Sequence, residues 1–451
     1  MADDIIFRPL QFRNLTVKNR VFRSNVAGRF GNYNGSGGQA RINWEVKFAR
    51  GGVGAIISSF VPVTGKGRIL PNYAFIDKDD KIPFWKKVAE SVHQFDCPYI
   101  LQLSHSGRQQ DIGGVENMDR RVLSSTNNRD PFHGILCTAM TTQQVREVVQ
   151  LFADGARRAR EAGIDGVELH GANGYLITQF LSSAINDRDD EYGGCLENRA
   201  RFVLDIIRAV RKEVGNDYHF QVKISAIDHD NVINPFTKAG NTLEDSIQVC
   251  KWMEEAGVDA IHVSVGSLFP HPLNPRGGFP FEHAVRSYPV LLPWGVDTHR
   301  NYNFFRRRWM HPIFRLLWNR VARGIPVEGV SVGAASAIKK AVGIPVIVTG
   351  GFQRASYIRE VLERGDCDGV SIARALIANN DLVKMFAAGK DMPDSPCTHC
   401  NKCLLYAPSY PLGCYEESRF NSYDEMIEEV MSVYDPPGEW VVPLPGKQAY
   451  A

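Results

Sequence analysis

Three short stretches of the chain repeat one pattern and decide its fold: residues 162–167 read AGIDGV, residues 256–261 read AGVDAI and residues 364–370 read RGDCDGV. In each stretch a glycine follows an amphipathic segment, and an aspartate then precedes an apolar run. Gly163 and Gly257 fall just past two predicted helices, where glycine is a preferred cap because positive φ costs it nothing. The pattern therefore predicts a helix followed by a buried strand, at least three times.

Short apolar runs of this kind recur along most of the chain. Several are β-branched and apolar on both faces, as in strands of a parallel sheet that helices cover. The runs span residues 20–25, 53–59, 98–103, 165–170, 219–225, 259–265, 345–349 and 368–372. Helical periodicity predicts helices over 142–162, 196–214 and 242–256, the first with Thr141 and Thr142 as capping residues.

Eight strands, each followed by a helix, predict an α/β protein with the (β/α)8 TIM-barrel fold. A doubly wound open sheet is the alternative. That fold usually carries a G-x-G-x-x-G turn after an early strand, and no such turn follows any of the eight runs.

The composition is that of an ordinary globular protein, with 44% hydrophobic and 23% charged residues in a chain of 451. It excludes disordered and fibrous classes. A net charge of +2 gives no reason to expect nucleic-acid binding. No apolar run reaches the roughly 18 residues that a membrane span requires. The N-terminus, Met1-Ala2-Asp3-Asp4, is acidic where a secretion signal is basic, so we expect a cytoplasmic protein.

Two stretches do not fit the repeat. Residues 267–330 form a long insertion after the sixth strand, with eight Arg against three Asp or Glu over 281–330 and many aromatic residues between them. We expect a lid packed on its own barrel rather than a membrane or partner surface. Residues 391–451 form a Cys-rich extension. The predicted division is a barrel over 1–390, including the insertion, and an extension over 391–451.

Polar residues at the carboxyl ends of the predicted strands are the candidate active site, because TIM barrels place their sites there. His170, Asn173 and Tyr175 share one short loop and offer two hydrogen-bond donors and a weak acid, a set that can polarise a carbonyl group and supply a proton. Gly350 and Gly351 after the seventh strand, with Arg374 at the start of the eighth helix, predict a phosphate site.

The sequence resembles the Old Yellow Enzyme family of flavin-dependent ene-reductases. Four stretches carry the resemblance: 9–20 (PLQFRNLTVKNR), 102–108 (QLSHSGR), 170–182 (HGANGYLITQFLS) and 186–199 (NDRDDEYGGCLENR). The last is the most specific. The resemblance covers nearly the whole barrel and implies a TIM barrel with non-covalently bound FMN.

Carried over by position, the resemblance implies that His170 and Asn173 bind the substrate carbonyl and that Tyr175 protonates the α-carbon. It places further residues around FMN: Ser24, Asn25, Ala27 and Ser58 beside the flavin, Gln102 and Lys223 on its ring, and Gly350, Gly351, Ala373 and Arg374 at its phosphate. Lys223 stands where the family usually has Arg, and Ala373 where a Gly is common. Ala27 cannot donate a side-chain hydrogen bond to flavin O4, as the family's Thr or Cys does.

The resemblance implies an NAD(P)H-dependent oxidoreductase that reduces the activated C=C bond of small enone-type substrates by a ping-pong mechanism. One alternative is a relative of the 2,4-dienoyl-CoA reductases, whose barrels carry a C-terminal iron–sulfur cluster and continue into further domains; a chain ending at Ala451 is not expected to hold those. Another is a non-catalytic flavin-binding or scaffold barrel. The sequence leaves the physiological substrate, the choice of NADH or NADPH, and homo-oligomerisation open.

Four of the nine cysteines fall within 18 residues of the extension: Cys397, Cys400, Cys403 and Cys414. Their C-x2-C-x2-C-x10-C spacing suits an iron–sulfur cluster or a zinc ion. The dienoyl-CoA reductases have a similar cluster after the barrel, with one more residue in the second gap. The alternative is that these thiols are reduced and pack the tail.

Overall fold

The computed structural model describes residues 4–26, 28–110, 121–131, 134–230, 237–268, 271–294 and 296–434. Ala27, one of the predicted flavin-site residues, lies outside them. Among these residues, no helix is both long enough and apolar enough to cross a bilayer.

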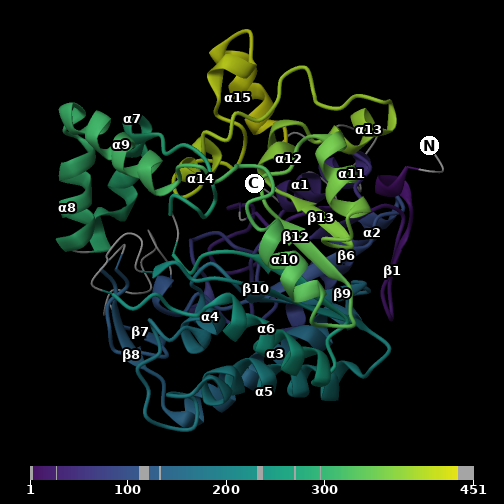
Figure 1. The fold of residues 1–451 in the computed structure, drawn as a ribbon, viewed down its shortest axis with the longest axis vertical. Coiled ribbons are helices and arrows are strands. Elements are labelled where there is room, and N and C mark those ends of the chain that lie inside the picture. The colour runs from purple at the N-terminus through teal and green to yellow at the C-terminus, as the bar shows by residue number, and fades with distance from the viewer. Residues whose placement is uncertain are drawn as a thin grey trace.

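Eight parallel strands close into a barrel at the centre of the molecule (Figure 1). Each of the eight predicted runs contains or overlaps one strand, and every strand residue but one, Thr349, is buried. In order round the barrel the strands are β3 (Val21–Arg23), β4 (Ala55–Ile57), β6 (Tyr99–Ser104), β9 (Gly166–Gly171), β10 (His219–Ser225), β11 (Ala260–Ser264), β12 (Val346–Thr349) and β13 (Gly369–Ile372). The predicted TIM barrel is confirmed, and the open-sheet alternative is wrong.

Helices follow the strands in the order that the fold requires. They are α1 (Gln39–Arg50), α2 (Ile82–His93), α3 (Thr142–Glu161), α4 (Leu176–Leu181), α5 (Leu196–Val214), α6 (Leu243–Glu255), α10 (Val332–Lys339), α11 (Ala355–Glu363), α12 (Arg374–Ala378) and α13 (Leu382–Ala387). Capping boxes at Thr141 and Thr242 fix where α3 and α6 begin, since each threonine accepts a backbone N–H from the third residue of its helix.

The insertion and the extension add helices outside the barrel. The insertion holds α7 (Phe281–Ser287), η6 (Tyr288–Trp294), α8 (Val296–Phe305), η7 (Arg308–Met310) and α9 (His311–Val321), at the left edge of Figure 1. The extension holds α14 (Lys402–Tyr406) and α15 (Tyr423–Met431). The remaining short strands are β1 (Leu10–Gln11) and β2 (Thr16–Val17), β5 (Val61–Pro62), and β7 (Arg121–Ser124) with β8 (Leu136–Ala139).

The repeated aspartate of the three opening stretches has one structural role. Asp165, Asp259 and Asp368 each stand just before a strand and accept the backbone N–H of the neighbouring strand, from Tyr99 (2.7 Å), Phe220 (2.9 Å) and Val346 (2.9 Å). Each carboxylate therefore fixes the register of one strand pair at the amino-terminal end of the barrel.

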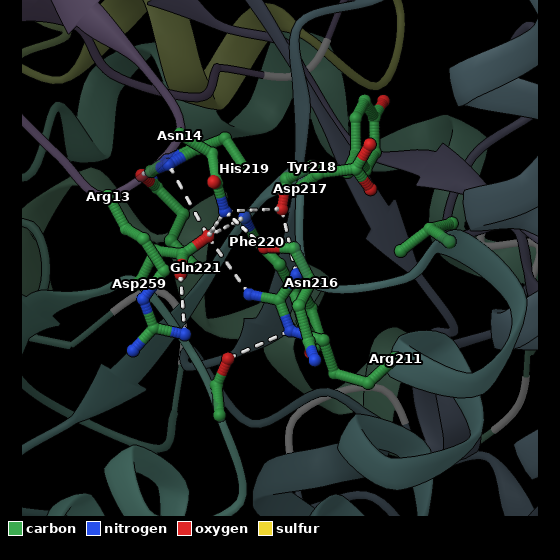
Figure 2. A network of polar contacts seen from close by, with 12 residues as sticks. Arg13, Asn14, Arg211, Asn216, Asp217, Tyr218, His219, Phe220, Gln221 and Asp259 are labelled. Carbon is green, nitrogen blue, oxygen red and sulfur yellow. Dashed lines mark hydrogen bonds and ion pairs between the residues drawn. The ribbon is translucent and has the colours of Figure 1, made fainter.

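A basic side chain balances each of these aspartates: His93 on Asp165 (2.7 Å), Arg211 on Asp259 (2.9 Å) and Lys339 on Asp368 (2.5 Å). Figure 2 shows the most buried case, in which Arg211 and Asn14 converge on Asp259. Below the barrel, apolar residues of the β1–β2 hairpin pack on the inward side chains of the strands.

Candidate active site

A cavity of about 290 Å³ opens at the carboxyl ends of the strands. The loops that follow the strands form its floor, and the insertion and the extension contribute its walls. Ten of the predicted residues line it: Ser24, Asn25, His170, Asn173, Tyr175, Lys223, Gly350, Gly351, Ala373 and Arg374.

The end of β9 and the loop after it bring the three predicted catalytic residues together. The ring centroids of His170 and Tyr175 lie 4.7 Å apart, and Phe60 packs 5.0 Å from Tyr175 on another side. Asn173 adopts positive φ, a conformation that asparagine tolerates better than most residues. Its backbone N–H donates to Ser225 Oγ (3.2 Å), and one N–H of its amide donates to Asn274 Oδ1 (3.1 Å).

Burial keeps both His170 and Tyr175 uncharged. It lowers the pKa of His170 well below 6.5, and it raises the pKa of Tyr175 above 10. The Ala172 N–H points to His170 Nδ1 at 3.5 Å, so the proton of the neutral ring belongs on Nε2. The loop thus presents an imidazole N–H, an amide N–H and a protonated phenol to the cavity.

Lys223 lies beside His170 because the two residues are register partners on β10 and β9. Its Nζ donates to Asn25 Oδ1, which connects the strand to the loop after β3. Burial lowers the pKa of Lys223 to about 8, and the nearby Glu168 partly offsets this effect. The side chain is therefore a cation at neutral pH.

Gln102 and Ser58 lie inside the barrel and do not line the cavity. Gln102 Nε2 donates to Glu168 Oε1 (2.7 Å), and Ser58 Oγ accepts the Gln102 backbone N–H (2.8 Å). Glu168 also accepts from Gln221 (2.5 Å) and His262 (2.8 Å). Burial alone would raise the pKa of Glu168, but His262 and these hydrogen bonds hold it near 2.

One atom of this buried layer has no partner among the described residues: Gln102 Oε1. A buried acceptor left unpaired costs about 1–3 kcal/mol, and a donor on a ligand that reaches below the cavity floor would restore this hydrogen bond. The flavin ring carries such a donor at N3, and its negative charge on reduction suits the Lys223 cation. The chemistry of this side of the cavity fits FMN.

The predicted phosphate residues form the opposite side of the cavity. Gly351 has a φ of +71°, and a Cβ there would lie 2.4 Å from the Val327 carbonyl oxygen, so only glycine fits. The N–H groups of Gly351 and Ala373 donate to no described residue. Arg374 already donates to Asn401 Oδ1 (2.6 Å) and to the Arg276 carbonyl (2.8 Å). Backbone donors and a fixed cation together fit a phosphate.

The four clustered cysteines line one small cavity beside Arg374. None forms a disulfide, and within the described part of the chain no three Cys, His, Asp or Glu side chains form a set that could hold a metal ion. Arg419 donates to Cys414 Sγ at 3.0 Å. The sulfur atoms are thus gathered but not arranged as ligands, and the metal site stays a prediction.

Several residues of the cavity wall were not predicted from the sequence. His271, Asn274, Tyr288, Leu291 and Trp318 come from the insertion, and His399, Asn401, Leu404, Ala407 and Pro408 come from the extension. No strand end precedes these residues, so the barrel pattern could not locate them. The aromatic content of the insertion was the one available signal.

The fold and the sequence both have known relatives. A 2-naphthoyl-CoA reductase in complex with 2-naphthoyl-CoA superposes with a TM-score of 0.76 at 23% identity, over 97% of this chain and 58% of that one. An old yellow enzyme homologue from Zymomonas mobilis superposes with a TM-score of 0.62 at 19% identity, over 90% of this chain and 99% of that one. At these identities the likeness concerns the fold.

Sequence relatives are more informative about the family. The chain is 32% identical over 397 residues to an NADH oxidase of Thermoanaerobacter brockii, over 88% of this chain and 52% of that protein. It is 36% identical over 294 residues to an NADPH dehydrogenase of Geobacillus sp. (strain WCH70), over 63% of this chain and 80% of that protein. The chain thus spans about half the length of the NADH oxidase.

The family model matches residues 5–290, which include β1 to β11 and so the four site residues His170, Asn173, Tyr175 and Lys223. This family implies a flavin and NADH or NADPH as cofactors. The chain belongs to the NADH:flavin oxidoreductase / NADH oxidase family.

Proposed function

We propose that the protein is an FMN-dependent ene-reductase that uses NAD(P)H to reduce the activated C=C bond of α,β-unsaturated carbonyl compounds. The observation that carries this proposal is the loop after β9. Two neutral donors, His170 Nε2–H and the Asn173 amide, stand beside the phenol of Tyr175, whose raised pKa keeps it protonated. That set suits an electrophilic carbonyl and a proton acceptor next to it.

FMN would lie between the Lys223 side of the cavity and the Gly351 side. Lys223 and Gln102 would contact its ring, and Gly350, Gly351, Ala373 and Arg374 would hold its phosphate. When bound, FMN would supply the hydride-transfer chemistry between NAD(P)H and the alkene. Because both substrates would use the same cavity, the residues here support a ping-pong order.

The chain's own residues have separate tasks. His170 and Asn173 bind the carbonyl oxygen and draw electron density from the β-carbon of the alkene. Tyr175 gives its proton to the α-carbon and regains one from solvent. The apolar cavity wall, including Phe60 and Leu291, excludes water, which strengthens the two hydrogen bonds to the carbonyl oxygen.

The direct test separates the two half-reactions by anaerobic stopped-flow spectroscopy. NADPH or NADH should bleach the flavin band of the FMN-loaded protein, and cyclohex-2-enone should restore it. Cyclohexene, which has no carbonyl group, is the matched control substrate and should leave the flavin reduced. If cyclohexenone and cyclohexene behave alike, the proposed substrate class is wrong.

A second candidate is an acyl-CoA reductase with an iron–sulfur cluster, related to the dienoyl-CoA reductases. The observation that favours it is the small cavity shared by the four cysteines, since Arg374 lines both this cavity and the larger one. A structural neighbour is described with an aryl-CoA ligand. A thioester carbonyl would use the same two donors.

Two measurements decide this second candidate. Anaerobic purification followed by iron, sulfide and zinc analysis tests the cluster, and a trace of metal per FMN would mean that the cysteines are only thiols. Comparing kcat/KM for an enoyl-CoA with that for cyclohexenone tests the substrate. A lower value for the thioester would contradict this candidate.

A further inference from the structure

Helix α9 of the insertion is apolar on the side that faces solvent. Leu316, Leu317 and Ile313 are 65%, 54% and 48% exposed, and Trp309 in the turn before the helix is 69% exposed. The spacing 309, 313, 316 and 317 places these side chains on one helical face. Five of the eleven large apolar side chains that are exposed in the described ranges lie within residues 304–317. We call residues 304–323 the outer segment.

The opposite side of α9 packs on the rest of the insertion through two aromatic residues. Phe314 packs on Phe281 and Trp318 on Phe279, with ring centroids 5.7 and 5.1 Å apart, and Trp318 Nε1 donates to the Gly277 carbonyl (2.9 Å). Trp318 also lines the large cavity. A surface helix normally turns its large apolar side chains towards the core, so a cluster of them left exposed beside Arg320 indicates a missing partner surface.

Positive charge surrounds this exposed apolar face. Arg306, Arg307, Arg308, Arg320 and Arg323 are exposed, and the structure assigns them no carboxylate partner among its described residues. The three acidic residues of 281–330 are already paired with other arginines: Glu282 with Arg315, Asp297 with Arg300 and Glu328 with Arg354. The free charge of the outer segment is therefore positive.

We propose that the outer segment docks the protein on an anionic lipid surface, with Trp309, Ile313, Leu316 and Leu317 in the acyl boundary and the arginines at the headgroups. Arginine-flanked helices with exposed Trp and Leu bind membranes in this manner, lying in the interface without spanning it. This role is additional to the expected one of a lid on its own barrel. The proposal concerns where the enzyme docks and does not depend on the reaction.

Charge and shape favour this occupant over two others. A second copy of the chain would bring the same five arginines against one another across a two-fold axis. An acidic protein would need a surface complementary to a protruding helix, and Figure 1 places α8 and α9 at one edge of the molecule, away from the barrel. A lipid surface needs no such complementarity.

The test is co-sedimentation of the full-length protein with vesicles. Wild type should sediment with vesicles of phosphatidylcholine and phosphatidylglycerol, and not with phosphatidylcholine alone. The triple variant Arg306→Gln, Arg307→Gln, Arg308→Gln should bind the mixed vesicles about 100-fold more weakly, at about tenfold or less per arginine. The double variant Leu316→Glu, Leu317→Glu should bind at least about tenfold more weakly. Tyr423→Glu, at a 62% exposed residue of α15, is the matched control and should bind as wild type does.

Four results would overturn the proposal. The first is that wild type stays in the supernatant with the mixed vesicles. The second is that the leucine variant binds these vesicles as tightly as wild type does. The third is a wild-type dimer that the leucine variant converts to a monomer, measured by light scattering, since a second copy would then cover the helix. Binding to immobilised polyglutamate without vesicle binding would equally reject lipid in favour of an acidic protein. Circular dichroism of each variant confirms that it folds.

Discussion

The two ends of the barrel treat polar groups in opposite ways. At the amino-terminal end, Asp165, Asp259 and Asp368 each have a backbone donor and a basic side chain within 2.9 Å. At the carboxyl end, polar groups face a cavity, and burial shifts the pKa values of Lys223 and His170 away from their usual range.

The difference indicates which end holds the fold and which end holds a ligand. A carboxylate whose partners are all on the protein contributes to stability and gains nothing from a ligand. A lysine held in a wall of the cavity costs stability that a bound molecule can return. Replacing residues at the amino-terminal end should therefore affect stability, and replacing residues at the carboxyl end should affect chemistry.

The largest effect is expected at the carboxyl end. Tyr175→Phe should slow reoxidation by cyclohexenone about 10²–10⁴-fold, because it removes the proton donor. Reduction by NAD(P)H should stay within a few-fold of wild type, since that step needs no phenol. Tyr73→Phe is the matched control, a tyrosine of the same cavity outside the loop, and should leave both steps unchanged. An unaltered reoxidation rate for Tyr175→Phe in stopped flow would reject Tyr175 as the acid.

The next effect is expected at the amino-terminal end. Asp259→Ala leaves the buried Arg211 without a carboxylate, with backbone carbonyl partners only, and should lower the free energy of unfolding by about 3–5 kcal/mol in urea titrations. Asp165→Ala and Asp368→Ala remove carboxylates that are 28% and 23% exposed, so they should cost less, about 1–3 kcal/mol. The flavin half-reactions of all three should remain as in wild type. If one of these variants has a slower half-reaction and unchanged stability, the amino-terminal end takes part in the chemistry, and the division between the two ends is wrong.

The smallest effect concerns Lys223 and depends on pH. Its lowered pKa, about 8, means that the side chain is charged below pH 8 and neutral above it. Lys223→Met should lower the midpoint potential of bound FMN at pH 7 by about 30–60 mV, the equivalent of one charged hydrogen bond. The difference in midpoint potential between the variant and wild type should shrink as pH rises through 8. The control Lys212→Met, at a distant exposed residue, should leave the potential unaltered. A difference in potential between Lys223→Met and wild type that does not change with pH would contradict the role given to the Lys223 charge.

Much of the barrel could be predicted from the sequence because one local pattern repeats. The AGxD-type turn encodes both the helix end at Gly163 or Gly257 and the aspartate that fixes strand register, so each unit could be recognised alone. Helix α5 begins and ends at the predicted residues, Leu196 and Val214.

The site was less predictable where it depends on distant segments. His170, Asn173, Tyr175 and Lys223 follow from strand ends and were predicted to share a site. Gln102 was expected at the flavin; its Nε2 is held by Glu168 in the layer below the cavity and its Oε1 has no described partner, and strand alternation does not show how deep a side chain lies. The walls from the insertion and extension depend on long-range packing, which no local pattern in them encodes.

The carboxyl end of the barrel is proposed to hold one FMN. The measurement that tests this most directly is the visible absorption spectrum of the purified full-length protein, recorded after incubation with FMN and removal of unbound flavin. We expect bands near 450 nm that correspond to about one FMN per chain. Adding a phenol that occupies the His170 and Asn173 donors should perturb these bands. A colourless protein that retains no FMN would contradict it.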